Sequence, residues 1–138
     1  GHPNFPAPGR RPATTRHAWA WAPPAGGRVL GATPGGANQM PWNAQSLARL
    51  LASGAPADAT AVAEAVVGPR WEWDPADDGL RIEAGFAPDQ ASALAERVGR
   101  AEQVERWALR SAMQIVADAG GVAVGAVDPR TVGAAIPG

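Results

Sequence analysis

A glycine-rich stretch at Gly31–Gln39 constrains the fold more than any other part of the chain. It follows an apolar segment, 28–33, that is typical of a buried strand, and it precedes a segment, 40–53, whose apolar residues recur with a helical period. Pro34 fixes its own φ angle and favours an extended conformation for the residue before it, so the strand should end there. The Gly35–Gly36 pair can adopt positive φ angles and carries no Cβ. The stretch therefore predicts a tight turn of bare backbone between a strand and a helix.

The Gly35–Gly36 turn suggests a chemical role because its N–H groups would point outward beside the first turn of a helix. The helix dipole favours negative charge at that end. Two N–H donors in this position suit the oxyanion that develops on a carbonyl during acyl transfer. The alternative is a turn that connects a strand to a helix and takes part in no chemistry.

The composition excludes several other function classes. The chain has 138 residues, one domain's worth at most, and its net charge of −1 leaves no basic face for nucleic acid. It contains no cysteine and only two histidines, so we expect no disulfide, no thiolate nucleophile, and no metal or cofactor site built on these ligands. The carboxylates between 74 and 78 lack the spacing of a calcium loop. No apolar run reaches the roughly 20 residues that span a bilayer, so we expect no membrane segment.

The order of the predicted elements indicates an α+β fold. Apolar alternation predicts strands, and a 3.6-residue apolar period between turn residues predicts helices. The predicted strands are 17–22, 28–33, 80–83, 112–117 and 122–127, and the predicted helices are 40–53, 56–67 and 88–98. Trp71–Trp73 is either a short strand or an exposed aromatic pair. Strands joined by short turns favour an antiparallel sheet with helices packed on one face, and no Gly-x-Gly-x-x-Gly motif is present.

Two adjacent hydroxyl residues, Thr14 and Thr15, precede the first predicted strand. Strand-entry threonines most often bond to neighbouring backbone, which is the alternative to a role in binding. They flank the same predicted hairpin as Gly35–Gly36, and both pairs supply donors while neither supplies a nucleophile. Within the first strand, Trp19 and Trp21 would lie on one face and are typical of core or interface packing. The chain holds no defensible Ser/His/Asp or Cys/His arrangement.

Four short motifs occur along the chain. They are Arg11–Thr15 (Arg-Pro-Ala-Thr-Thr), Thr33–Gly36 (Thr-Pro-Gly-Gly), Gly68–Arg70 (Gly-Pro-Arg) and Val127–Arg130 (Val-Asp-Pro-Arg). In this order they resemble the landmarks of gamma-glutamyltransferases, in the later part of the small, catalytic subunit. The resemblance covers nearly the whole chain, and residues 1–12 are similar to the acylase-like bacterial branch of that family. It implies the αββα sandwich of the N-terminal-nucleophile hydrolases, with antiparallel sheets and flanking helices.

The resemblance also implies a role for each of the pairs singled out above. In the family a precursor cleaves itself, and the freed Thr at the start of the small subunit attacks the substrate carbonyl. A hydroxyl pair holds the α-carboxylate of the substrate, and this pair corresponds here to Thr14 and Thr15. The Gly-Gly pair supplies the oxyanion hole and corresponds to Gly35 and Gly36. No cofactor is implied.

These correspondences predict that residues 1–138 are the C-terminal part of a small subunit rather than a whole enzyme. The nucleophile would lie upstream of Gly1, in a part of the small subunit outside this chain. The implied partners are that upstream part, a large subunit from the same precursor, and a small acyl substrate bearing a carboxylate. We expect neither nucleic acid nor a membrane as a partner. We expect a cytoplasmic location, with a periplasmic or secreted one as the alternative.

Two departures from the family pattern leave the substrate open. The Thr-Thr pair replaces Ser-Ser, so two added methyl groups narrow the carboxylate pocket. Trp42 follows the Gly-Gly turn and lies either at the pocket rim or against the partner subunit. We expect an amide-cleaving gamma-glutamyl transferase or hydrolase. The alternatives are an enzyme of the same family in natural-product (antibiotic) biosynthesis that cleaves a different acyl or C–C bond, and a non-catalytic binding module that keeps the fold.

Overall fold

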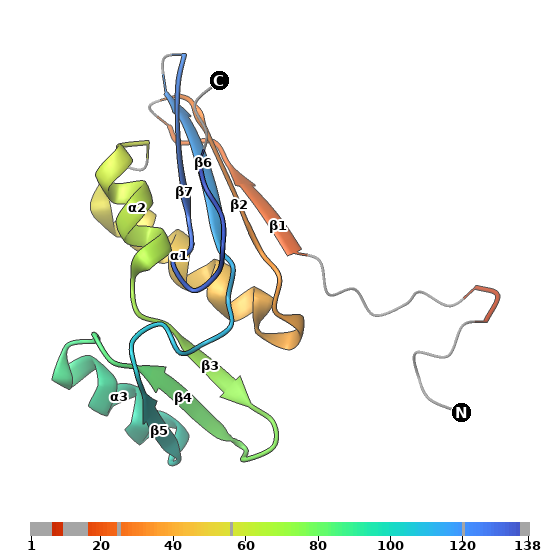
Figure 1. Cartoon of the computed structure of the whole chain (residues 1–138), viewed down its shortest axis with the longest axis vertical. Coiled ribbons are helices and arrows are strands. Elements are labelled where there is room, and N and C mark those ends of the chain that lie inside the picture. Colours follow the sequence, from red (N-terminus) through yellow and green to blue (C-terminus); the bar gives the residue numbers. More distant parts are fainter. Residues whose placement is uncertain (1–6, 10–16, 25, 56, 120, 136–138) are drawn as a thin grey trace.

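The computed structural model describes residues 7–9, 17–24, 26–55, 57–119 and 121–135. Its elements are β1 (His17–Trp21), β2 (Arg28–Thr33), the short 3-10 helix η1 (Gly36–Asn38), α1 (Gln39–Ser53), α2 (Ala59–Val67), β3 (Trp71–Asp74), β4 (Gly79–Glu83), α3 (Pro88–Val98), β5 (Ala101–Val104), β6 (Gln114–Ala119) and β7 (Val122–Val127). They form two sheets with flanking helices (Figure 1). The predicted α+β class is confirmed.

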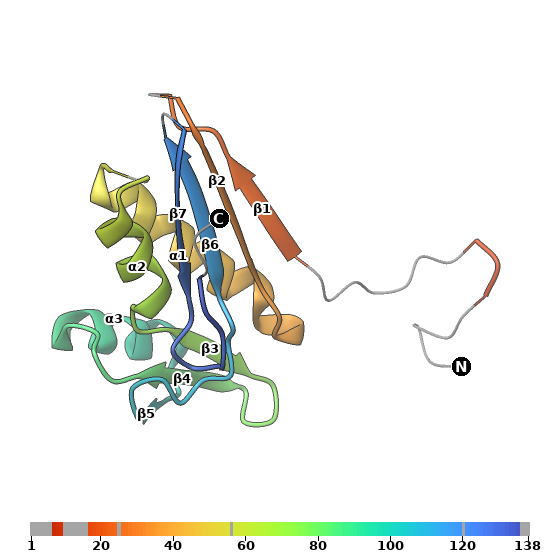
Figure 2. The same cartoon turned by 45° about the horizontal axis from the view of Figure 1, so that its top comes forward.

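The larger sheet contains antiparallel strands in the order β1-β2-β6-β7. Both predicted hairpins, β1–β2 and β6–β7, are present, and the central β2–β6 pair joins them. Helices α1 and α2 cover one face of this sheet (Figure 2). Because side chains alternate along a strand, Val29 of β2 and Ile115 of β6 point into the core beneath the helices. There they pack in one cluster with Leu50 of α1 and Val62 of α2.

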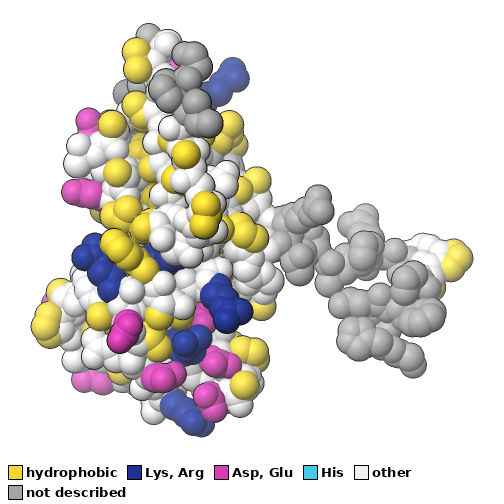
Figure 3. Space-filling model, viewed as in Figure 1, with side chains coloured by type: hydrophobic (Ala, Val, Ile, Leu, Met, Phe, Trp, Pro, Cys, Tyr) yellow, Lys and Arg dark blue, Asp and Glu magenta, His cyan; other side chains and the backbone are white. Residues whose placement is uncertain are grey.

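The middle of the opposite face of the larger sheet is apolar and exposed, and Arg28 and Asp118 share this face at one end of the β2–β6 pair. Leu30 of β2 is 53% exposed, and Val116 of β6 is 48% exposed. Charged side chains gather instead over the part of the surface that contains the β3–β5 sheet and α3 (Figure 3). A sheet face that meets water normally carries polar side chains. The apolar middle of this face therefore has the composition of an internal layer.

The smaller sheet has the strand order β3-β4-β5. Trp71–Asp74 pairs antiparallel with β4, so the first of the two predictions for this segment, a short strand, is correct. Strands β4 and β5 pair in parallel, with α3 as the crossover between them. Strand β5 was not predicted, because Ala-Glu-Gln-Val is short and lacks apolar alternation. This parallel pair is an addition to the predicted antiparallel arrangement.

The helix ends coincide with local sequence signals. Asp58 caps α2, where its Oδ1 accepts hydrogen bonds from the N–H groups of Thr60 (2.9 Å) and Ala61 (3.1 Å). Helix α1 ends at Gly54, which has a left-handed φ of 70°. Among the described residues, no helix combines the length and the apolar character needed to cross a membrane.

Candidate functional site

The Gly35–Gly36 turn leads from β2 into η1 and α1. Gly35 has φ 147° and ψ 20°, and Gly36 has φ 58°, so both adopt the positive φ angles that glycine tolerates. The Gly35 C=O accepts a hydrogen bond from the Asn38 N–H (3.1 Å). The Gly35 and Gly36 N–H groups donate no hydrogen bond to another described residue. The predicted turn is thus present, with two adjacent donors at the start of a helix.

Trp42 explains why position 35 requires glycine. A Cβ at Gly35 would lie 2.1 Å from Cζ3 of the Trp42 ring, far inside van der Waals contact. Trp42 itself is only 2% exposed. A Cβ at Gly36 would meet no described neighbour within 4 Å, so this residue borders open space. Trp42 was predicted to lie either at the pocket rim or against the partner subunit. The ring is buried within this chain, beneath the turn, and it also lines a hollow that borders the turn, so the first position describes it better.

The beginning of β1 lies beside this turn, because His17 pairs with Thr33 at the end of β2. Side chains of α1 hold it there. The His17 N–H donates to Gln39 Oε1 (2.9 Å), and the His17 C=O accepts from Asn43 Nδ2 (3.1 Å). Asn43 Oδ1 also accepts from Trp19 Nε1–H (3.1 Å). These roles of Gln39 and Asn43 could not be predicted, because a polar side chain on a helix carries no local signal of what it will contact.

The predicted carboxylate-binding pair, Thr14 and Thr15, lies outside the described residues. Downstream of it, Trp19 and Trp21 are partly buried and pack against the hydrophobic core, as predicted. The Trp19 ring lies over Gly31, where a Cβ would be 2.2 Å from Cζ2. Gly31 therefore lets the large ring pack flat on the neighbouring strand.

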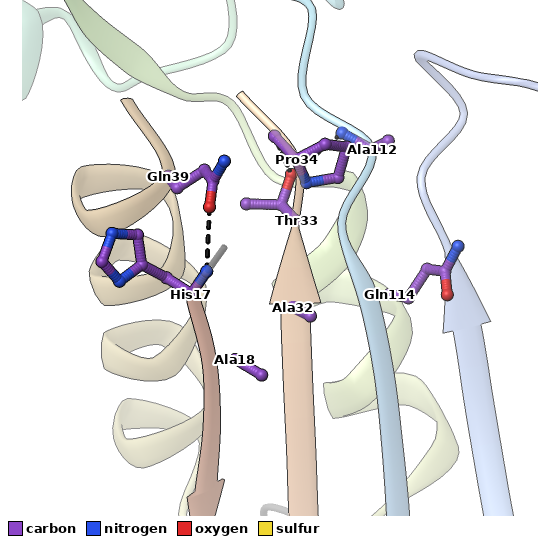
Figure 4. A pocket seen from close by; sticks show the side chains of 8 residues that line it. All are labelled: His17, Ala18, Ala32, Thr33, Pro34, Gln39, Ala112 and Gln114. Carbon is purple, nitrogen blue, oxygen red and sulfur yellow. Dashed lines mark hydrogen bonds between the residues drawn. The ribbon is translucent and has the colours of Figure 1, made fainter. Parts of the chain in front are cut away.

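A hollow of about 350 Å³, which we call the Thr33 pocket, opens at the same end of the sheet (Figure 4). It is lined by His17, Ala18, Ala32, Thr33, Pro34, Gln39, Ala112 and Gln114. The Thr33 hydroxyl donates to the Pro34 C=O (2.8 Å) and accepts from the Ala112 N–H (3.0 Å). Both bonds tie the pocket wall together, so this hydroxyl is engaged in structure and is not poised as a nucleophile.

A second hollow, of about 450 Å³, borders the turn itself and extends to the smaller sheet. Its lining residues are Gly35, Asn38, Trp42, Glu72, Arg81, Ala108 and Arg110, and we call it the Arg110 pocket. Glu72 Oε1 accepts a hydrogen bond from Arg81 Nη1 (3.0 Å). Burial raises the pKa of Glu72, although the charge of Arg81 opposes this shift. Within the described part of the chain, no group of three potential ligand side chains could hold a metal ion.

The Gly-Pro-Arg and Asp-Pro-Arg motifs meet in a buried ion network. Arg70 Nη1 lies 2.6 Å from Asp128 Oδ2, and Arg130 Nη1 lies 2.9 Å from Asp128 Oδ1. Arg130 also pairs with Glu83 of β4. All four side chains are fully buried. Burial opposes the ionisation of Asp128, but the charge of Arg70 and the hydrogen bonds to the carboxylate outweigh it and lower the pKa of Asp128. The network joins the smaller sheet to the end of β7.

Comparison with known proteins places this arrangement in a family. The chain matches the sequence profile described as Gamma-glutamyltranspeptidase over residues 1–138. A mutant of Helicobacter pylori gamma-glutamyltranspeptidase has a TM-score of 0.69 and 20% identity, and the match covers 95% of this chain and 69% of that one. A highly active mutant of the Pseudomonas nitroreducens gamma-glutamyltranspeptidase has a TM-score of 0.72 and 18% identity, and the match covers 99% of this chain and 69% of that one. The Bacillus anthracis transpeptidase enzyme CapD has a TM-score of 0.65 and 16% identity, and the match covers 95% of this chain and 75% of that one. No curated protein sequence matches the chain.

The structural matches and the sequence profile establish different things. At identities below 25%, the solved structures show a shared fold and nothing further. The profile covers every residue from 1 to 138 and shows the family. The chain belongs to the gamma-glutamyltranspeptidase family of enzymes.

Proposed function

We propose that this chain is the C-terminal part of the small catalytic subunit of a gamma-glutamyltransferase-like enzyme, and that its Gly35–Gly36 turn stabilises the reaction's oxyanion. The observation that carries the proposal is the pair of adjacent N–H groups at the start of η1 and α1 that have no acceptor among the described residues. Donors placed where negative charge develops are typically worth about 10²–10³ in kcat each. The open space beside Gly36 leaves room for a substrate carbonyl to approach.

In the proposed reaction, a Thr hydroxyl from the upstream part of the small subunit attacks an acyl carbonyl. The amino group of that Thr takes the hydroxyl proton, and the carbonyl oxygen becomes an oxyanion that accepts hydrogen bonds from the turn. Collapse of this intermediate breaks the bond to the leaving group, which departs with the proton and leaves an acyl-enzyme. Water or an acceptor amine then attacks the acyl-enzyme, which gives hydrolysis or transfer. The reaction uses no cofactor.

Thr14 and Thr15 bind the substrate carboxylate in this proposal, and the Thr33 pocket takes the acyl part of the substrate. Thr15 precedes His17 by two residues, and the pairing of His17 with Thr33 puts the start of β1 at the end of the sheet where the turn begins. Hydroxyl groups bind carboxylates through charge-assisted hydrogen bonds.

The exposed face of the larger sheet supports the proposed partners. Leu30 and Val116 on this face are about half exposed. An extended apolar surface usually marks an interaction site. We propose that the upstream part of the small subunit, together with the large subunit, covers this face as the second layer of an αββα sandwich.

A natural-product enzyme that cleaves a different acyl or C–C bond is the second candidate. The Thr-Thr pair favours it, because the added methyl groups narrow the carboxylate pocket. Trp42 adds little support, because its ring lines the Arg110 pocket but is only 2% exposed. Turnover of glutathione, a glutamyl anilide and an aromatic amino-acid derivative separates the two candidates. Preference for both glutamyl donors supports gamma-glutamyl transfer, and preference for the aromatic compound supports the alternative.

The oxyanion role is tested by Gly36→Ala in the complete enzyme, with Gly54→Ala as a matched control. The two glycines have similar left-handed φ angles, 58° and 70°, and at neither would an added Cβ meet a described neighbour within 4 Å. Each substitution should therefore cost about 1–2 kcal/mol of folding free energy. Only Gly36→Ala puts a methyl group beside the proposed oxyanion, so it alone should lower kcat, by about 10²-fold. Equal kcat values for the two variants would leave the turn as a connection only.

A further inference from the structure

We propose that the Arg110 pocket binds a carboxylate on the leaving group and, in the second half of the reaction, on the acceptor. The inference rests on the proposed acyl transfer, because it assigns a second part of the substrate to a second hollow. Leaving group and acceptor use the same place in turn, since the acceptor attacks the acyl-enzyme along the path by which the leaving group departed. One carboxylate site therefore serves both.

The position of the Arg110 pocket relative to the turn supports this assignment. Gly35 is one of its lining residues, so a carbonyl bound at the turn lies at the edge of this pocket. The Thr33 pocket is lined by Thr33 and Pro34, which directly precede the glycine pair, and by His17 at the beginning of β1. With the acyl part placed at the Thr33 pocket, the Arg110 pocket is left for the group that is exchanged.

The charges in the Arg110 pocket favour an anionic ligand. Arg81 Nη1 lies 3.0 Å from Glu72, and Arg81 Nε lies 3.6 Å from Glu102, so its charge is already compensated. Arg110 forms no ion pair with any described residue. The lining therefore carries one uncompensated guanidinium group. Its planar array of donors matches a carboxylate in a bidentate arrangement.

The backbone that carries Arg110 is held on both sides by the buried ion network. The Leu109 N–H donates to Glu83 Oε1 (3.1 Å), and Ser111 Oγ donates to Asp128 Oδ2 (2.7 Å). Leu109 is 1% exposed and Ser111 is 2% exposed, whereas Arg110 between them is exposed. The anchored neighbours leave the Arg110 side chain directed away from the core and toward the pocket. A cationic side chain on a fixed backbone loses less conformational entropy when it binds a ligand than one on a mobile backbone.

The facing wall of the pocket is fixed as well. Asn38 exchanges two hydrogen bonds with the backbone of Trp73: its Nδ2 donates to the C=O, and its Oδ1 accepts from the N–H, both at 3.1 Å. These bonds tie η1 to β3, and Gly35 rests against the Trp42 ring. The shape of the pocket is therefore present before a ligand binds.

The test compares two acyl donors on the complete enzyme, a glutamyl anilide and its analogue with a carboxylate on the aniline ring. The wild-type enzyme should show the lower KM for the carboxylated donor. Arg110→Gln should raise that KM about tenfold or more, the effect of losing a charge-assisted hydrogen bond, and should leave its kcat and the KM of the neutral donor unchanged. Arg110→Lys should restore part of the loss, because it keeps the charge and loses the planar fork.

Arg106→Gln is the matched control, because Arg106 is an exposed arginine on the same segment that does not line the pocket. Its guanidinium lies over the Trp107 ring, 4.7 Å from the centroid, and its substitution should change neither KM. If Arg110→Gln raises both KM values equally, or changes neither, the assignment of the pocket is wrong while the acyl transfer stands. A wild-type enzyme that turns over neither donor would overturn the proposed function, and this inference with it.

Discussion

The buried ion network makes Asp128→Asn a demanding test of the structure. The Asp128 carboxylate accepts hydrogen bonds from the side chains of Arg70, Ser111 and Arg130 and from the backbone N–H groups of Met113 and Arg130. Asparagine keeps the shape of this side chain but removes its charge. It also replaces one acceptor oxygen by an NH₂ donor. Whichever way the amide turns, its NH₂ group faces at least two N–H donors, so at least two of these hydrogen bonds are lost.

The size of the effect follows from burial. In the wild type, two arginines are matched by two carboxylates, Asp128 and Glu83, with all four side chains fully buried. In the variant, the two buried guanidinium groups of Arg70 and Arg130 are matched by only one carboxylate, that of Glu83. Removing one partner of a buried ion pair typically costs about 3–5 kcal/mol. With a urea slope of about 2 kcal/mol per M, the unfolding midpoint should fall by about 2 M.

The same carboxylate predicts a pH dependence. The pKa of Asp128 in the folded state lies below its ordinary value of 3.8, so the carboxylate stabilises the fold at pH values above the unfolded-state pKa. That contribution is lost as the pH falls through the folded-state pKa. The gap in unfolding free energy between wild type and Asp128→Asn should therefore be widest near pH 7 and should narrow below about pH 4.

The assay is urea unfolding at several pH values, with Asp77→Asn as the control. Asp77 forms an exposed pair with Arg100 at 3.5 Å, so its loss should change the free energy of unfolding by less than about 1 kcal/mol. Two results would contradict this role of Asp128. One is an Asp128→Asn variant within about 1 kcal/mol of the wild type at pH 7, and the other is a gap of constant size from pH 7 to pH 3.

Four further predictions concern the site and the proposed subunits. Trp42→Ala should cost about 3–5 kcal/mol by emptying the space beneath the turn, and should lower kcat as Gly35 loses its support. Gly35→Ala should cost less in the Trp42→Ala background than alone, because the ring 2.1 Å from the added Cβ is gone; additive costs in a double-mutant unfolding cycle would contradict this packing. Thr14→Val, which removes a hydroxyl but keeps the shape, should raise KM only for substrates that carry the carboxylate, and equal losses with and without it would favour a structural role. Intact-mass analysis of the native protein should find this sequence within a longer small subunit paired with a large one; a lone, fully active 14.1 kDa species would contradict the proposed partners.

Local sequence signals were sufficient to predict where several elements begin or end. Pro34 follows the last residue of β2, Gly54 follows the last residue of α1, and Pro88 begins α3, all as predicted. These residues act through their own φ angles, so a short window of sequence contains the whole physical cause. The positive φ angles of Gly35–Gly36 were predictable for the same reason.

Features that depend on distant residues were not predictable. Arg70 and Asp128 are 58 residues apart in the sequence, and nothing local distinguishes a buried arginine from an exposed one. Residues 101–104 form a strand because they pair with β4, not because of their own side chains. Gln39 is buried because β1 begins beside it. The roles assigned to the Thr14–Thr15 pair and to the glycine turn stay predictions.

The hydrogen bond from the Ala112 N–H to the Thr33 hydroxyl closes a long excursion of the chain. Helices α1 and α2 and the whole smaller sheet lie within residues 34–111, which leave and re-enter the larger sheet at this one point. Closing a loop of that length costs about 4 kcal/mol of chain entropy on a (3/2)RT ln n scale. The β1–β2 and β6–β7 hairpins are local and should form early. The pairing of β2 with β6, which we call the β2–β6 seam, can form only after residues 34–111 have folded. Substitutions along this seam should therefore slow refolding more than substitutions at either hairpin turn. During synthesis, β2 keeps an open strand edge until β6 emerges, and such an edge is a site for pairing with other chains.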